Sequence, residues 1–328
     1  MDIENRDHLV GAIKYLSRKK IAPTRAAIFF TESITKWEKD EQLLDFELGE
    51  LVTNGLAIRS DDVYSLTSEG RELAQQNDAR EFGAMLIANE QSAAYRIMCR
   101  EVYGSDRFHF DMMTQNQLEK LLDVLHISKC KNILDAGCGT GAITEYLADQ
   151  TNGNIIGIDF SSEAIEFAQK RKNKKPNNLS FQVMDMENIT FPSNSFDTIL
   201  SIDTLYFITD LQSTINTLHN CLQEKGQMGI FYSSKISVDD SKDMLRPENS
   251  RLAHALEKCG MEYKTWDFTA EEKELWKKSI DIANELKDRF IEEGNLAIYN
   301  DHIDESTRWL GFHESGLACR YLFHAWVS

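Results

Sequence analysis

The 328-residue sequence has little of what marks membrane, secreted or metal-bound proteins. It holds only four prolines, and no apolar run approaches the roughly 18 residues of a membrane span. Its six cysteines are scattered, without a CxxC pair or the spacing of a metal site. The first residues carry acids and no apolar signal segment. We therefore expect a cytoplasmic protein with reduced thiols, no membrane association and no bound metal.

Basic residues are also scarce. The chain has 36 Lys and Arg against 53 Asp and Glu, a formal net charge of −17. A field of that sign repels nucleic acid and anionic lipid, and it mildly favours cationic ligands. The hydrophobic fraction of 42% is ordinary for a globular protein, and the length suits one large domain and one smaller one. The charge balance predicts that nucleic acid is not a partner.

Residues 1–80 are predicted to form a small helical unit that ends in a hairpin. Residues 8–19 have helical apolar spacing, and residues 40–57 follow as a second amphipathic helix. We expect its stripe to be formed by Leu43, Leu44, Leu48, Leu51 and Val52. Two short strands with a turn at 61–62 follow, and then a helix capped by Thr67 or Ser68. This order of elements resembles a winged helix.

Local charge opposes DNA binding by this winged-helix-like unit. The expected recognition helix and its lead-in, Lys36 to Glu50, contain six acids and two lysines. A helix of that charge lacks the electrostatic attraction to phosphates that supplies most non-specific affinity. The unit is therefore predicted to serve another purpose than DNA recognition.

The remainder of the chain reads as a helical segment, 81–128, followed by a larger domain, 129–328. Strands are expected at 131–136, 154–159, 179–185, 196–202 and 226–233, with helices at 141–149, 162–172 and 210–223. Alternation of this kind indicates βαβ units in a doubly wound, mostly parallel α/β sheet. A helix near 247–259, a strand at 261–268, a helical insertion at about 269–315 and a closing strand at 317–327 complete the prediction.

A glycine-rich loop follows the first strand of this domain. The stretch NILDAGCGTG, residues 132–141, places Asp135, Gly137, Gly139 and Gly141 at alternate positions before a helix. Glycines let a ligand approach the main chain, and a helix N-terminus favours an anionic group, either phosphate or carboxylate. A dinucleotide fingerprint has two residues before its last glycine, whereas this loop has one. The spacing therefore disfavours a nicotinamide dinucleotide.

Acidic residues end the next two predicted strands. Asp159 ends the segment NIIGIDFS, where a carboxylate can accept both hydroxyls of a ribose. Asp185 and Met186 end LSFQVMDME, where they can meet the amine and the ring face of an adenine. Each has a plainer interpretation, because Asp159 could cap the next helix and Asp185 could be an ordinary turn residue.

Taken together, these elements resemble the class I S-adenosylmethionine-dependent methyltransferases. The resemblance is strong over 130–235 and implies a seven-stranded, Rossmann-like sheet. It also implies that Asp135 and the backbone of Gly137, Cys138 and Gly139 hold the methionine end of S-adenosylmethionine, with Ser201 below it. Cys138 is otherwise expected only to fill a small space.

The same resemblance assigns the other end of the cofactor. It implies that Asp159 binds the ribose, that Phe160 lies beside the adenine, and that Asp185 and Met186 flank it. Phe160 could equally be a hydrophobic residue at a helix entry.

Methyl acceptors in this fold lie over the ends of the fourth and fifth strands, which gives candidate catalytic residues. Asp203 and Tyr206 follow the fourth strand, and His109 lies ahead of the first strand in a segment that relatives fold over the cofactor. Asp203 or His109 could remove a proton, but Asp203 could also cap a helix and His109 could merely pack. Related O-methyltransferases carry a histidine in the LHxW pattern where this chain reads LYFITD, which leaves amine N-methylation open.

The flanking segments predict a closed site for a small or medium-sized acceptor. The insertion at 269–315 and the N-terminal unit would cover it, and either Arg320 or Tyr321 would reach it. In related small-molecule methyltransferases a winged-helix unit also pairs two chains, so a homodimer through the N-terminal domain is expected. Two alternatives stay open: a winged-helix regulator with a non-catalytic methyltransferase fold, and a methyltransferase acting on proteins or peptides.

Overall fold

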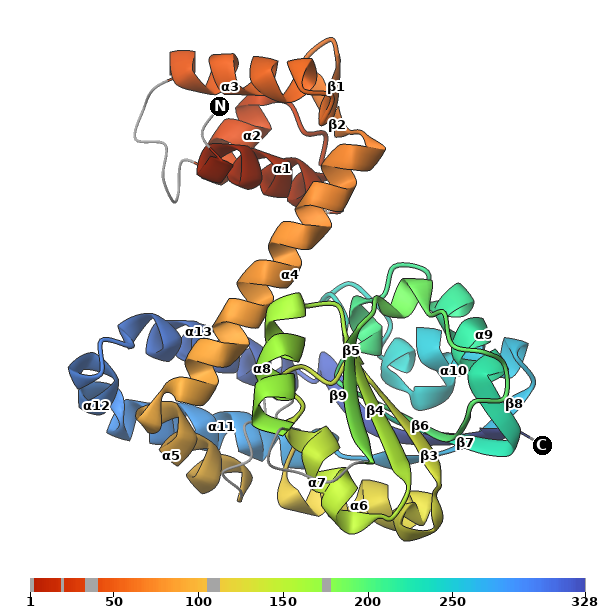
Figure 1. Cartoon of the computed structure of the whole chain (residues 1–328). Coiled ribbons are helices and arrows are strands. Elements are labelled where there is room, and N and C mark those ends of the chain that lie inside the picture. Colours follow the sequence, from red (N-terminus) through yellow and green to blue (C-terminus); the bar gives the residue numbers. More distant parts are fainter. Residues whose placement is uncertain (1–2, 19–20, 33–40, 105–112, 173–177, 328) are drawn as a thin grey trace. The chain divides into compact units, whose positions relative to one another are not determined.

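The computed structural model describes residues 3–18, 21–32, 41–104, 113–172 and 178–327, and it divides into two compact units. The smaller unit spans Met1–Phe82 and the larger Gly83–Ser328. Figure 1 shows the elements of each. None of the helices formed by the described residues is both long and apolar enough to cross a membrane.

The smaller unit packs three helices against a two-stranded antiparallel hairpin. Its elements are α1 (Ile3–Arg18), α2 (Arg25–Glu32), α3 (Glu41–Thr53), β1 (Ala57–Ser60) and β2 (Val63–Leu66). Leu9, Ile13 and Leu48 are fully buried in its core. The expected stripe is only partly correct, because Leu43 and Val52 are exposed while its other three residues are buried. The winged-helix interpretation of this unit stays a prediction.

A single helix, α4 (Ser68–Gln91), runs through the position where the sequence suggested a boundary at residue 80. Thr67 begins it, because its hydroxyl accepts a hydrogen bond from the Gly70 N–H at 3.1 Å. Two capped helices follow in the larger unit, α5 (Ala93–Tyr103) after Ser92 and α6 (Gln115–Leu125) after Thr114.

The larger unit is built on a seven-stranded sheet of order β5-β4-β3-β6-β7-β9-β8, as the sequence predicted for this fold class. Its strands are β3 (Asn132–Ala136), β4 (Asn154–Asp159), β5 (Leu179–Val183), β6 (Phe196–Ile202), β7 (Leu222–Lys235), β8 (Met261–Asp267) and β9 (Ala318–Val327). Strands β3 to β7 are parallel, and β9 pairs antiparallel with both β7 and β8. Strand β7 is longer than expected at both ends, because Leu222 pairs with Phe196 of β6 and Lys235 pairs with Ala318 of β9.

Helices cover both faces of the sheet (Figure 1). One face packs against α6, α7 (Ala142–Gln150) and α8 (Ser162–Lys172), and the other against α9 (Leu211–Cys221) and α10 (Arg251–Lys258). Short 3-10 turns connect these layers: η1 (Ile127–Lys129), η2 (Met186–Asn188), η3 (Leu205–Phe207), η4 (Lys242–Leu245) and η5 (Pro247–Asn249). The central strands β3 and β6 are buried on both sides, which explains their continuous apolar character, whereas the edge strand β8 is largely exposed and polar.

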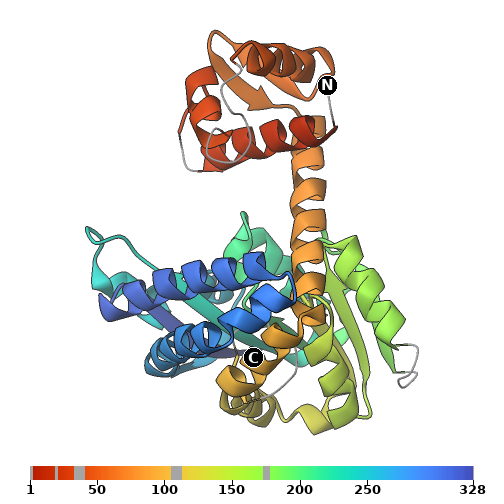
Figure 2. The same ribbon diagram turned by 90° about the vertical axis from the view of Figure 1, so that its left-hand side faces the viewer.

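The predicted helical insertion consists of α11 (Thr269–Glu285), α12 (Lys287–Glu292) and α13 (Leu296–Glu314), drawn in blue in Figure 2. These helices share a separate apolar cluster with α5, in which Met98, Leu275 and Phe290 are buried. The insertion is therefore fixed to the helix that precedes the sheet and not to the sheet alone.

Candidate functional site

The glycine loop lies between β3 and α7 and is tied to the end of β4. The N–H groups of Gly137 and Cys138 both donate to the Ile158 carbonyl, at 2.8 and 2.9 Å. Gly137 has φ +85°, and a Cβ there would lie 2.4 Å from the Thr204 methyl carbon. Only glycine suits this position, because the backbone is left-handed and the neighbouring loop approaches closely.

Asp159 ends β4 and closes the loop from the other side. Its two carboxylate oxygens accept from the N–H groups of Gly139 and Ser161, both at 2.9 Å. Burial raises the pKa of Asp159, and these backbone hydrogen bonds oppose the shift. Ser161 caps α8 through the Ala164 N–H, so Asp159 is not needed as the cap. Phe160 beside it is 37% exposed.

Asp135 is buried beneath the loop, where its carboxylate accepts a 2.6 Å hydrogen bond from the Thr144 hydroxyl. Burial raises its pKa to about 6 against that hydrogen bond, and the charge of Asp159 adds to the rise. Cys138 is a free thiol whose pKa burial also raises, which is not the state of a nucleophile. Asp135 therefore joins the first strand to α7 inside the loop.

Asp185 and Met186 lie at the end of β5. Asp185 begins η2 by accepting from the Glu187 N–H at 2.9 Å, and Met186 packs partly buried against the core. Glu187 in turn accepts from the N–H groups of Thr209 and Asp210 in the segment after β6. The ends of β4, β5 and β6 are thus linked along one edge of the sheet, where parallel strands place their carboxyl ends.

The C-terminal part of α4 packs beside the glycine loop and the start of α8. A Cβ on Gly83 would lie 2.1 Å from the Ser161 hydroxyl, so the helix passes very close to the start of α8. Arg171 on α8 forms an ion pair with Glu90 of α4. It also donates a 2.6 Å hydrogen bond to Glu145 and a 2.7 Å hydrogen bond to the Thr140 carbonyl. Sequence reasoning missed Arg171 and Glu90, because residues so far apart in the chain share no local pattern.

The segment after β6 holds Ser201, Asp203 and Tyr206. The hydroxyl of Ser201 bonds to that of Thr204, which also donates to the Ala136 carbonyl at 3.2 Å. Asp203 is a buried non-glycine residue with φ +55°, a strained backbone that surrounding contacts must hold. Tyr206 packs edge-on against Tyr232, with ring centroids 6.0 Å apart. His109 lies outside the described residues.

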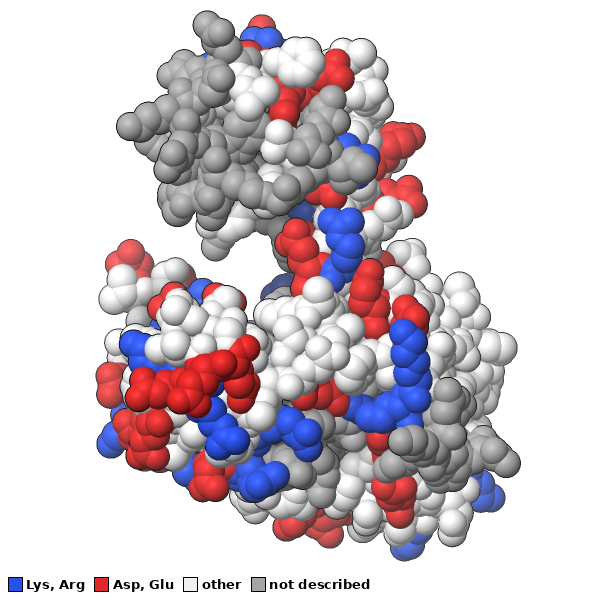
Figure 3. All heavy atoms as spheres, turned by 60° about the vertical axis from the view of Figure 1, so that its left-hand side comes forward, with Lys and Arg blue, Asp and Glu red and all other residues white. Residues whose placement is uncertain are grey.

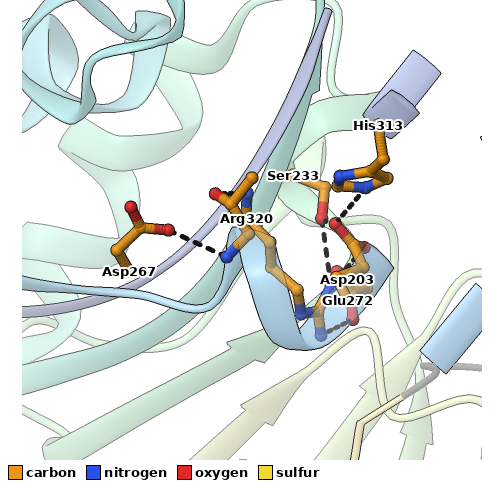
Figure 4. A network of polar contacts seen from close by, with 7 residues as sticks. Asp203, Ser233, Asp267, Glu272, His313 and Arg320 are labelled. Carbon is orange, nitrogen blue, oxygen red and sulfur yellow. Dashed lines mark hydrogen bonds and ion pairs between the residues drawn. The ribbon is translucent and has the colours of Figure 1, made fainter. Parts of the chain in front are cut away.

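Arg320 supplies those contacts from β9 (Figure 4). Its guanidinium donates two 2.6 Å hydrogen bonds to the two oxygens of Asp203 and a third, of 3.0 Å, to the Ser233 hydroxyl. Of the two residues that the sequence left open, Arg320 is therefore the one that reaches the end of β6. Side chains alternate along β9, since Leu322 and Phe323 pack in the cores on opposite faces of the sheet.

The helical insertion completes this buried charge network. Glu272 of α11 lies 3.5 Å from Arg320, and His313 of α13 lies 2.9 Å from Glu272. Burial raises the pKa of Asp203 to about 6, with Arg320 opposing the shift. Burial alone would lower the pKa of Arg320, but the two carboxylates raise it. Through Arg320 and Asp203, the network connects the helical insertion to the segment after β6, which contains Thr204 beside Gly137.

This geometry defines a class of protein: a doubly wound sheet whose first βα loop meets the acid that ends the second strand, at the carboxyl edge of the parallel strands. Residues 127–287 match the family model described as a methyltransferase domain. Residues 127–287 therefore form a methyltransferase domain, and the sheet of the larger unit has the fold of the class I S-adenosylmethionine-dependent methyltransferases.

Individual relatives are more distant. Phosphoethanolamine N-methyltransferase 1 of Arabidopsis thaliana is 26% identical over 194 residues, 56% of this chain and 39% of that protein. The malonyl-[acyl-carrier protein] O-methyltransferase of Acetivibrio thermocellus is 36% identical over 109 residues, 32% of this chain and 38% of that protein. This chain thus spans about two fifths of the length of either relative.

Among solved structures, phosphoethanolamine N-methyltransferase 2 of Haemonchus contortus has the same fold. It superposes with a TM-score of 0.61 at 17% identity, covering 75% of this chain and 60% of the other. That protein was solved with phosphomonomethylethanolamine and S-adenosylhomocysteine.

Proposed function

We propose that this chain transfers the methyl group of S-adenosylmethionine to a small-molecule amine. The observation that carries the proposal is the meeting of the glycine loop and Asp159 at the ends of adjacent strands β3 and β4. Both belong to a sheet with the strand order of this family.

The residues at this edge fit the cofactor. The loop has no side chain at 137, 139 or 141 to block its main chain. Each oxygen of Asp159 accepts one backbone hydrogen bond and keeps a lone pair for a ribose hydroxyl. The exposed ring of Phe160 offers a face to an adenine, with Asp185 and Met186 at the next strand end. When bound, S-adenosylmethionine would supply a methyl group activated on a sulfonium.

The chain's own contribution is to position the acceptor and to exclude water. Transfer by in-line displacement depends mainly on the alignment of the acceptor's lone pair, so rigid walls matter more than acid–base groups. The bidentate contact with Arg320 occupies both oxygens of Asp203, and we propose that Asp203 positions the loop after β6. Its assignment as a catalytic residue, like those of Tyr206 and His109, stays a prediction.

Nitrogen is the proposed acceptor atom for two reasons. The chain lacks the LHxW histidine of related O-methyltransferases, and its net charge of −17 favours cationic ligands. The plant and nematode relatives are named as N-methyltransferases, which agrees with this choice.

The experiment has two parts. Calorimetry with S-adenosylhomocysteine tests the cofactor site, and radiolabelled methyl transfer from S-adenosylmethionine to panels of amines, phenols and carboxylates tests the acceptor class. We expect binding and transfer to amines. Absence of S-adenosylhomocysteine binding would overturn the proposal, and binding without transfer to any small molecule would favour a non-catalytic or protein-directed role.

A further inference from the structure

A pocket of about 260 Å³ lies in the larger unit between the end of α4, α5 and α13. The rings of Tyr95 and Tyr103 on α5 form its buried part, with exposed fractions of 5% and 2%. His302 of α13 stands edge-on to Tyr95, with ring centroids 6.1 Å apart. Asp301 and Glu305, on the same helix, add two carboxylates to a lining that also includes Asn89 of α4.

The charge of this pocket has one sign. Among the described residues that line it there are two carboxylates, Asp301 and Glu305, and no Lys or Arg. Residues 269–315 as a whole carry twelve Asp and Glu against six Lys and Arg. Figure 3 shows acidic side chains gathered over this part of the surface. Burial raises the pKa of Glu305, with Arg308 among the groups that oppose the shift, so a cation beside this carboxylate would be stabilising.

The aromatic groups suit the same kind of ligand. Burial lowers the pKa of His302 to about 4, so the imidazole is neutral near pH 7 and accepts or donates a hydrogen bond with Ser279 at 2.7 Å. Burial also raises the pKa of Tyr95, which stays a neutral ring. Neutral aromatic faces attract an organic cation, and the attraction increases when the cation is desolvated.

The α4 wall of the pocket comes close to the glycine loop. Its lining residue Met85 precedes Leu86, whose side chain would lie 3.4 Å from a Cβ on Gly139. The pocket and the glycine loop therefore share one turn of α4.

We propose that this pocket binds the amine acceptor of the proposed reaction in its protonated form, as a small organic ammonium without a phosphate group; this ammonium must release a proton to water before its nitrogen has the lone pair that attacks the methyl group. The inference rests on the proposed function for the role of acceptor, but cation binding can be measured separately. A phosphate would bring its negative charges beside Asp301 and Glu305, with no basic side chain among the described lining residues to offset them. The phosphorylated amines in the names of the relatives are therefore disfavoured for this chain.

The test uses the full chain and three related probes, titrated by calorimetry with and without saturating S-adenosylhomocysteine. The probes are choline, its uncharged carbon analogue 3,3-dimethylbutan-1-ol, and phosphocholine. We expect choline to bind at least about tenfold more tightly than either of the others, because only choline pairs a positive charge with the rings and lacks a phosphate.

Two variants and a matched control assign the effect to the pocket. Asp301→Asn and Glu305→Gln should each weaken choline binding by about fivefold and leave the uncharged analogue unaffected. Asp304→Asn removes an exposed charge from the same helix outside the pocket and should change neither. Asp301 is exposed, so its variant should fold even where Glu305→Gln does not.

Equal binding of choline and its analogue, tighter binding of phosphocholine, or equal losses in Asp301→Asn and Asp304→Asn would overturn the inference. Failure here is separable from failure of the proposed function. Binding of S-adenosylhomocysteine without preference for choline would remove the cation site alone, whereas preference for choline without binding of S-adenosylhomocysteine would remove the methyl-transfer role alone.

Discussion

Replacing Arg320 with methionine should destabilise the larger unit strongly. The guanidinium is fully buried and holds Asp203 through two 2.6 Å hydrogen bonds, with Glu272 at 3.5 Å. Methionine nearly fills the volume but leaves Asp203 without a cation and Glu272 with His313 and the Ser233 hydroxyl. Removing one partner of a buried ion pair costs about 3–5 kcal/mol. For a unit of this size we expect the melting temperature to fall by roughly 6–20 °C.

The stability that Arg320→Met loses should also depend on pH. The pKa of Asp203 is about 6 with the guanidinium present, above its usual 3.8, and it should rise further without it. A carboxyl whose pKa is raised by folding stabilises the folded state below its unfolded pKa and loses that contribution as the pH rises through its folded pKa. Arg320→Met should therefore be less destabilised at pH 5 than at pH 7.5, and adding Asp203→Asn should restore part of the stability at pH 7.5.

Urea unfolding at both pH values, followed by circular dichroism, measures these effects. Arg246→Met is the matched control, because Arg246 pairs with Asp243 at 3.1 Å with both side chains about two thirds exposed. Exposed pairs contribute little, so this variant should unfold like the unaltered protein. A loss below about 1 kcal/mol in Arg320→Met, or the same loss at both pH values, would refute the reasoning.

Three further predictions concern the cofactor edge and the pocket. Gly137→Ala places a Cβ 2.4 Å from Thr204 at φ +85° and should weaken S-adenosylhomocysteine binding about tenfold or more. Gly139→Ala should weaken it less, and equal affinities of the two variants would contradict this prediction. Asp159→Ala should cost at least about tenfold in the same calorimetric titration, and an unchanged Kd would remove the ribose assignment. His302 has a folded pKa of about 4, below its unfolded value of 6.5, so the free energy of unfolding should fall by up to about 3 kcal/mol between pH 6.5 and 4. Urea unfolding of His302→Gln should lack this loss, and parallel pH profiles of the two proteins would refute the prediction.

Local sequence pattern was sufficient to predict the sheet. Strands β3 to β6 begin and end within about two residues of the expected ranges, because buried parallel strands are continuous apolar runs between polar turns. The glycine spacing and the acid at residue 159 predict which edge binds a nucleoside, since both are short-range features of one βαβ unit, and this assignment stays a prediction. Helix α4 continues across residue 80, and the domain boundary expected there stays a prediction.

The acceptor side could not be predicted in the same way. The sequence placed Asp203, Tyr206, Arg320 and Tyr321 near the ends of the right strands, but their partners were undetermined. Asp203 and Arg320 lie 117 residues apart and meet only because β9 inserts antiparallel beside β7. Local sequence periodicity cannot predict a contact between residues so far apart in the chain.

The sequence by itself therefore determined the class of fold, the glycine loop and the acidic strand ends, because each follows from residues within a few positions of one another. Only the tertiary structure decided that Asp203 faces Arg320 and that α4, α5 and α13 enclose an acidic, aromatic pocket. The spacing of Asp301, His302 and Glu305 on α13 was a signal in the sequence, but its meaning depended on α5 packing against it. The physical reason is that side-chain packing between distant segments, and the burial that accompanies it, sets both the charge states and the partners of these groups.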